Sequence, residues 1–159
     1  MIQHVDREGP DLIGMDSRSS GSMLVSALTA GLTASGRDVW QLGLCPTPAV
    51  PLLIREHGAA GGVMVSASHN PPEDNGIKAF GANGAKLSAE RQSRIESGLR
   101  GELEFDGADA NRAYGTSRAS TDLLDAYRLA LIGSVGTLRL DGVPIVLDLC
   151  WGSATACGA

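Results

Sequence analysis

The chain has 159 residues, and its 43% hydrophobic content is that of one folded domain with a buried core rather than of a disordered segment. A formal net charge of −5 and a pI near 5.1 argue against a nucleic-acid-binding surface. No apolar run approaches the roughly 20 residues of a membrane span, and the first ten residues lack the pattern of a signal peptide.

The cysteines give a further indication of the compartment. Cys45, Cys150 and Cys157 are odd in number and form no C-x-x-C pair. This pattern favours free thiols in a reducing cytosol over a disulfide or a metal site, so we expect a cytoplasmic protein.

Short apolar runs predict the strands of the chain. In the first half, strands are expected over residues 11–15, 39–42, 61–65 and 77–80. In the second half, Val143 to Leu149 predicts another buried strand, which leads into Trp151-Gly152-Ser153.

Helices are predicted between these strands. Leu24, Leu28 and Leu32 recur every four residues, which indicates a helix capped by Ser20 or Ser22 and ended by Gly36. The other helices are expected from Pro46 to Gly58, from Ser88 to about Leu99, and around Leu123, Leu124, Tyr127 and Leu131.

The alternation of strands and helices predicts an α/β domain with a mixed, mostly parallel sheet sandwiched by helices. We expect this domain to occupy residues 1–140, incomplete at its N-terminus, with a linker over about 102–120 that includes the acidic stretch Glu102 to Ala113. Residues 141–159 are expected to be the truncated start, with the opening strand, of a second α/β domain.

Two polar loops follow predicted strands, at the edge of the sheet where open α/β folds bind ligands. They are Asp16 to Gly21 and Ser66 to Gly76. Pro71 and Pro72 stiffen the second loop, as expected for a loop that holds catalytic groups in position. The alternative is a hydroxyl-rich surface turn in which Ser66 and Ser68 bond local backbone.

Several common catalytic patterns are absent. The chain has no G-x-S-x-G, no G-x-x-x-x-G-K-[ST] and no G-x-G, which leaves a nucleophile elbow, a P-loop and a dinucleotide fingerprint unsupported. Ser68 and His69 are adjacent, and neighbouring side chains diverge in an extended chain, so His69 is a poor base for Ser68.

The complete motifs carry a family resemblance. The string S-A-S-H-N-P at 66–71, followed by D-N-G-I-K at 74–78, resembles the active-serine loop of the α-D-phosphohexomutase superfamily, and its form is most similar to the phosphoglucosamine mutase branch. Supporting matches are G-M-D-S-R-S-S-G at 14–21, P-T-P-A-V at 46–50 and I-V-L-D-L-C-W-G-S-A at 145–154.

The resemblance implies an isomerase of the phosphohexomutase domain I type. Ser68 would be the phosphoserine, and the phosphosugar substrate would interconvert between glucosamine 6-phosphate and glucosamine 1-phosphate. Glucosamine 1,6-bisphosphate would be the intermediate and activator, and the product would lead to UDP-N-acetylglucosamine and peptidoglycan precursors. The alternatives are a phosphomannomutase or phosphoglucomutase of the same superfamily, or an inactive standalone binding module.

The resemblance also implies a cofactor and roles for the loop residues. Mg²⁺ would bind Ser68 through its phosphate; the family's D-G-D-x-D metal loop does not occur in this sequence, so we expect the chain alone to be inactive. Lys78 would be the acid–base group, with a pKa lowered by burial. His69 and Asn70 would hold the loop by hydrogen bonds, with packing an equal alternative for His69. Arg18 would orient the phosphate or pair with Asp16 or Asp74.

Overall fold

A computed structural model describes residues 8–103, 113–137 and 139–157. Five strands form one sheet in the order β4-β3-β1-β2-β5. Neighbouring strands are parallel except β3 and β4, which are antiparallel. The strands are β1 (Asp11–Met15), β2 (Val39–Leu44), β3 (Gly61–Val65), β4 (Ile77–Gly81) and β5 (Ser117–Ala119). The predicted mixed, mostly parallel sheet is confirmed.

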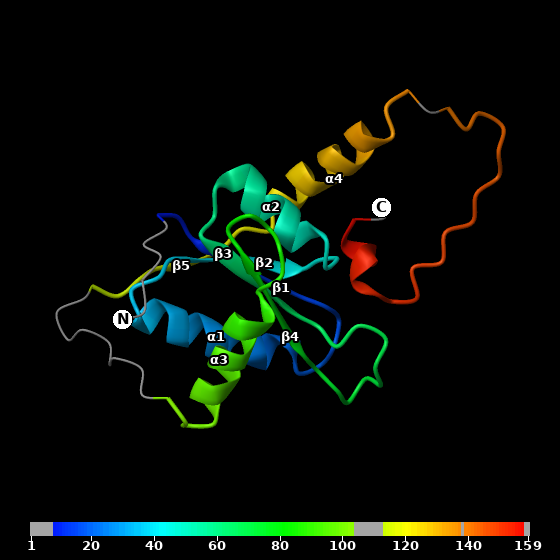
Figure 1. Ribbon diagram of the computed structural model, residues 1–159. Coiled ribbons are helices and arrows are strands. Elements are labelled where there is room, and N and C mark those ends of the chain that lie inside the picture. Colours follow the sequence, from blue (N-terminus) through cyan, green and yellow to red (C-terminus); the bar gives the residue numbers. More distant parts are fainter. Residues whose placement is uncertain (1–7, 104–112, 138, 158–159) are drawn as a thin grey trace.

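Helices cover both faces of this sheet (Figure 1). The longer elements are α1 (Gly21–Ala34), α2 (Ala49–His57), α3 (Ala89–Leu99) and α4 (Leu123–Ser134), and a short 3-10 helix, η1, spans Ser153–Ala156. On one face, α1 packs over a cluster formed by Ile13, Val25, Val39 and Val65. On the other face, α2 and α4 enclose a larger cluster that includes Leu12, Leu42, Leu53, Met64 and Tyr127.

The helix ends follow from local chemistry. Gly58 has φ 61°, a left-handed conformation that glycine adopts without strain, and it ends α2 as predicted. Gly36, with φ 77°, lies just past the end of α1. The hydroxyl of Ser88 accepts a hydrogen bond from the Arg91 N–H and so caps α3.

Close packing between β1 and α2 requires a glycine in β1. A Cβ atom added to Gly14 would lie 2.5 Å from Cys45 Sγ and 3.0 Å from Val50 Cγ2. The missing side chain therefore lets the buried Cys45 thiol pack against the sheet. Burial raises the pKa of that thiol to about 12, and the nearby Cys157 thiol acts in the same direction.

Two predicted features of the second half differ from the structure. The buried strand over 143–149 is wrong: this segment pairs with no strand in the described part of the chain, and its Val146 side chain is 96% exposed. Near the end of the range predicted as a linker, about 102–120, β5 joins the sheet edge beside β2. Most of the acidic connector, 104–112, lies outside the described residues, and the division into two domains remains a prediction.

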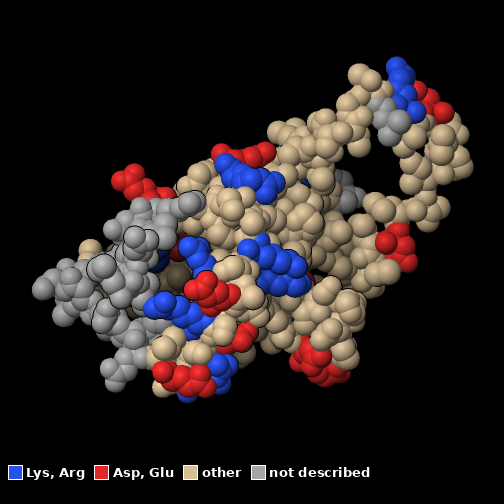
Figure 2. All heavy atoms as spheres, viewed as in Figure 1, with Lys and Arg blue, Asp and Glu red and all other residues tan. Residues whose placement is uncertain are grey.

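Charge is distributed unevenly over the surface. On the face in Figure 2, acidic and basic side chains are interspersed, while the part formed by α4 and the segment after it is mostly uncharged apart from groups such as the Arg139–Asp141 ion pair. Large apolar side chains are exposed there, including Leu129, Ile132, Ile145, Val146 and Trp151. Within the described ranges, no helix is both long and apolar enough to cross a membrane.

Candidate active site

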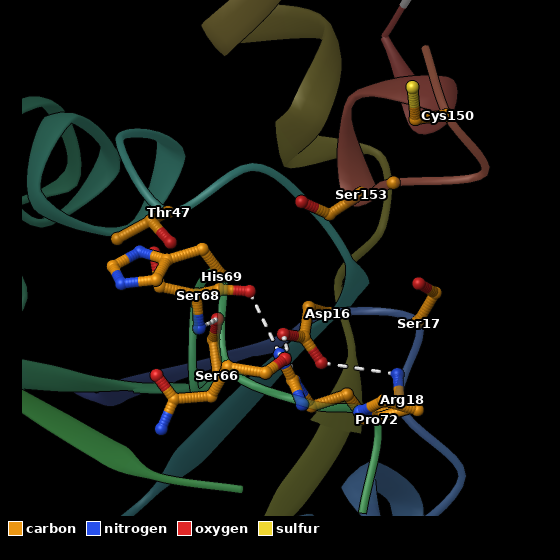
Figure 3. A pocket seen from close by; sticks show the side chains of 12 residues that line it. Asp16, Ser17, Arg18, Thr47, Ser66, Ser68, His69, Pro72, Cys150 and Ser153 are labelled. Atoms are coloured by element: carbon orange, nitrogen blue, oxygen red, sulfur yellow. Dashed lines mark hydrogen bonds and ion pairs between the residues drawn. The ribbon is translucent and has the colours of Figure 1, made fainter. Parts of the chain in front are cut away.

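The two predicted loops meet at one edge of the sheet, because β1 and β3 are adjacent and parallel and end together. They border a cavity of about 560 Å³, which also receives Thr47 from the turn before α2 and residues from the turn that leads into η1 (Figure 3). The lining residues are Asp16, Ser17, Arg18, Thr47, Ser66, Ser68, His69, Asn70, Pro72, Cys150, Gly152 and Ser153.

Ser68 is exposed at this cavity and has an unusual backbone. Its φ is 59°, and in the described part of the chain only Cys150 and Trp151 share a positive φ without being glycine. Left-handed backbone costs a residue with a Cβ about 1–2 kcal/mol, so neighbouring groups must stabilise it. The Ser68 N–H donates to Ser66 Oγ at 3.0 Å, and the Ser68 carbonyl accepts from Arg18 Nη2 at 2.8 Å.

Arg18 connects the first loop to the second. Its Nε donates to Asp16 Oδ2 at 3.1 Å, and its side chain is only 9% exposed. Its two terminal nitrogens donate to four carbonyl oxygens of the second loop, those of Ser68, Asn70, Pro71 and Asp74. An arginine has five N–H donors, and here each of them has an acceptor. Arg18 therefore acts as a clamp on the Ser68 loop.

Three further side-chain hydrogen bonds fasten the second loop. Asn75 Nδ2 donates to Ser20 Oγ at 2.9 Å, and Asn75 Oδ1 accepts from the Gly76 N–H at 2.8 Å. Ser20 stands at the N-cap of α1 but its hydroxyl does not cap that helix. Asn70 Nδ2 donates to Asp74 Oδ2 at 3.2 Å, within the same loop.

The other two expected site residues are placed differently. His69 lines the cavity, but its exposed ring makes no hydrogen bond to the described residues, so the expected loop-holding bond is not formed. Lys78 lies in β4 opposite Met64, half-buried, and is not among the residues that line the cavity. The structure thus brings Ser68, His69, Asn70 and Arg18 together, with Lys78 outside that group.

Sequence reasoning missed some of the lining residues. Thr47 belongs to the proline-flanked motif before α2, and its position there is the one signal that could have identified it. Cys150, Gly152 and Ser153 reach the cavity because the chain end folds back: Ala156 and Cys157 pack against the core beneath α2 and α4, and the Arg128 guanidinium donates to the Ala156 carbonyl.

The described residues do not supply a complete metal site. Within residues 8–103, 113–137 and 139–157, no group of three or more His, Cys, Asp or Glu side chains could hold a metal ion. Mg²⁺ prefers several oxygen ligands in near-octahedral geometry, so these residues alone do not fit it.

An open α/β sheet between helix layers, with a cavity where its parallel strands end, defines an α/β/α domain of the ligand-binding type. Residues 2–106 match the sequence model of the phosphoglucomutase/phosphomannomutase alpha/beta/alpha domain I. The chain belongs to this family.

Individual relatives agree with this assignment. The phosphoglucosamine mutase of Synechococcus sp. (strain CC9902) is 72% identical over 152 residues, covering 96% of the chain and 32% of the relative. The phosphoglucosamine mutase of Parasynechococcus marenigrum (strain WH8102) is 74% identical with the same coverage. The crystal structure of a phosphoglucomutase/phosphomannomutase family protein from Burkholderia thailandensis matches with a TM-score of 0.62 at 28% identity, covering 79% of this chain and 27% of that one. The chain spans about a third of the length of the curated relatives it matches.

Proposed function

We propose that this chain is the serine-bearing domain of a phosphoglucosamine mutase, an isomerase that interconverts glucosamine 6-phosphate and glucosamine 1-phosphate. One observation carries the proposal: an intact S-A-S-H-N-P loop presents the exposed Ser68 at a cavity, in a chain 72–74% identical to relatives named phosphoglucosamine mutase. A cavity of about 560 Å³ is within the usual range for small ligands.

In this proposal Ser68 carries the phosphoryl group. The P–O bond to Ser68 Oγ breaks as a free sugar hydroxyl attacks phosphorus, and that hydroxyl loses its proton while Ser68 Oγ gains one. The product of this step is the 1,6-bisphosphate. After the intermediate turns over, its other phosphoryl group returns to Ser68 with the opposite proton movements. Atoms and charge balance over the cycle, and the enzyme ends phosphorylated, as it began.

Fixed geometry is the contribution of the Ser68 loop. Phosphoryl transfer depends mainly on alignment and electrostatic stabilisation, so a phosphoserine gains from a rigid backbone. We assign Arg18 to this role rather than to the phosphate itself, because its five donors already have acceptors. Asn70 holds the loop with it, while His69 is free to contact the sugar phosphate.

Lys78 is the proposed acid–base group, although it lies outside the cavity lining. A lysine that only stabilised β4 would affect folding and not turnover. We therefore expect Lys78→Ala to slow turnover while phosphate on Ser68 stays detectable by mass spectrometry. Normal turnover in Lys78→Ala would remove Lys78 from the mechanism.

A divalent cation completes the proposal. A phosphoserine carries about −1.5 to −2 charge at neutral pH, and Mg²⁺ offsets such charge by binding a phosphate oxygen. From this chain only the Ser68 phosphate would contact the metal, and the other ligands would come from the part of the enzyme that the chain does not include. The enzyme would act in the cytoplasm, in the supply of UDP-N-acetylglucosamine for peptidoglycan.

A chimera tests the proposal. This chain would replace the matching third of the Parasynechococcus marenigrum enzyme, and turnover would be measured on glucosamine, glucose and mannose phosphates. We expect glucosamine phosphate to be preferred and Ser68→Ala to abolish turnover. The solved relative named phosphoglucomutase/phosphomannomutase makes those activities the alternative. About two thirds of the chimera come from the relative, so its sugar preference shows only that the two parts are compatible. Retained turnover in Ser68→Ala would refute the proposal.

A further inference from the structure

The backbone of Ser68 is held on both sides by side chains. Its N–H donates to Ser66 Oγ at 3.0 Å, and its carbonyl accepts from Arg18 Nη2 at 2.8 Å. The Ser68 backbone that these two hydrogen bonds hold is left-handed, with φ 59°. Fixing φ fixes the direction of the Cα–Cβ bond, and so restricts the reactive Oγ to the few positions that its side-chain rotamers allow.

We propose that Ser66 is a positioning residue that keeps Ser68 in this left-handed conformation. The proposal rests on the function proposed above, in which Ser68 carries the phosphoryl group. It assigns to the first serine of the S-A-S-H-N-P loop a role distinct from that of the second: Ser66 touches the Ser68 backbone and acts on phosphoryl transfer only through it.

Ser66 is itself fixed in space, as a positioning residue must be. It directly follows β3, and its N–H donates to the Gly76 carbonyl at 2.8 Å, which extends the β3–β4 pairing by one step. Its side chain is buried, with 4% of the residue exposed. The hydroxyl therefore links the rigid sheet edge to the exposed serine two residues later.

Other local groups do not duplicate this bond. The turn that contains Ser68 is closed by the Asn70 N–H, which donates to the Ala67 carbonyl at 3.2 Å and leaves the Ser68 N–H to Ser66. The Arg18 clamp acts on carbonyl oxygens only. In the described part of the chain, the Ser66 hydroxyl is thus the one acceptor recorded for the Ser68 N–H.

The expected effect is modest and measurable. A typical net hydrogen-bond contribution corresponds to about a 2- to 12-fold change in the ratio between the conformer it holds and the others. Removing the hydroxyl should reduce the ratio of left-handed to other Ser68 conformers by such a factor. The catalytic rate constant should fall by up to that factor, with a smaller change in the Michaelis constant, because the effect acts through the geometry of Ser68.

The test compares Ser66→Ala with Ser66→Thr, which retains a hydroxyl, and with Ser120→Ala as a control. Ser120 is 1% exposed, and its Oγ has no hydrogen-bond partner among the described residues, so this variant also removes a buried hydroxyl, but away from Ser68. Amide hydrogen exchange at Ser68, followed by NMR in the 159-residue chain, reports the bond directly. Turnover is measured in the chimera.

We expect Ser66→Ala to speed Ser68 amide exchange and to lower the catalytic rate constant by up to about 12-fold, with Ser66→Thr restoring both and Ser120→Ala changing neither. Exchange at Ser68 that is the same in Ser66→Ala as in the unsubstituted chain would overturn the inference, whatever the stability of the variants. If exchange changes while Ser68→Ala still turns over, the positioning stands and the proposed phosphoryl carrier is wrong. If Ser68→Ala is inactive but Ser66→Ala has full turnover, Ser66 is not a positioning residue.

Discussion

Replacing Arg18 should loosen the Ser68 loop, because its largely buried side chain holds that loop by four hydrogen bonds. Arg18→Ala removes five hydrogen bonds, one to the Asp16 carboxylate and four to loop carbonyls. The four carbonyls lie in an exposed loop and form hydrogen bonds to water when Arg18 is removed. The loss of these bonds therefore costs little net unfolding free energy. The Asp16 carboxylate is only 13% exposed and loses its cation, and breaking such a pair is costly.

The resulting estimate is a loss of about 3 kcal/mol in unfolding free energy for Arg18→Ala, allowing for partial solvent access. Arg18→Lys keeps the charge but offers three donors from one point instead of a planar fork. It should lose about 1–2 kcal/mol. Against a typical total stability of about 5–15 kcal/mol, both losses are measurable by urea unfolding followed by circular dichroism.

A matched control is available on the same chain. Arg100 pairs with Glu102 at 2.6 Å, but both side chains are 53% exposed, so Arg100→Ala should leave the unfolding midpoint unchanged. Amide exchange in the 66–76 loop should accelerate in the Arg18 variants and not in the control. An Arg18→Ala chain that unfolds within about 0.5 kcal/mol of the unsubstituted one, with unchanged loop exchange, would refute the clamp.

Three further outcomes are expected. Gly14→Ala should destabilise the chain by about 1–3 kcal/mol in urea unfolding, since its Cβ would lie 2.5 Å from Cys45 Sγ; an unchanged midpoint would show that the core adapts. Hydrogen bonds from the Thr116 N–H and hydroxyl lower the pKa of Asp38 below its ordinary 3.8, so its stabilising effect is full above that pH and is lost as pH falls through the folded value. Asp38→Ala should therefore lower the unfolding midpoint at neutral pH but not at strongly acidic pH, and an equal difference at both would contradict this account. With iodoacetamide at pH 8 the exposed Cys150 should react before the buried Cys45, whose pKa is raised to about 12, and peptide mapping that finds Cys45 modified first would disprove this order.

The regular elements were predictable because local patterns and tertiary structure agree. The strand over 61–65 is apolar, ends at a polar loop and is buried in the sheet. Gly36 and Gly58 lie where glycine signals place the helix ends, and both have positive φ. Placement of the Ser68 loop at the sheet edge then follows from strand order alone.

Features that depend on distant partners were not predictable. β5 consists of Ser117, Arg118 and Ala119, which are exposed and show no apolar pattern; pairing with β2 makes the strand, and the Arg118 guanidinium lies 3.9 Å from the centre of the Trp40 ring. Conversely, the apolar run 143–149 has the composition of a strand but no neighbouring strand in the described part of the chain.

The partners of Arg18 show the same limit at the site. The sequence allowed a phosphate, Asp16 or Asp74, and the guanidinium in fact bonds the Asp16 carboxylate and the backbone carbonyl of Asp74. Which of these groups Arg18 reaches depends on how two loops more than 50 positions apart in the sequence meet in the fold. The residues next to Arg18 in the sequence do not determine how the loops meet.

The central claim is that Ser68 carries the phosphoryl group, and phosphopeptide mapping of the chimera after turnover tests it most directly. The chimera would be incubated with the hexose 1,6-bisphosphate and Mg²⁺, digested and analysed by mass spectrometry. The account predicts one phosphate, on Ser68, absent from Ser68→Ala together with all turnover. Phosphate on another residue, or turnover by Ser68→Ala, would contradict it.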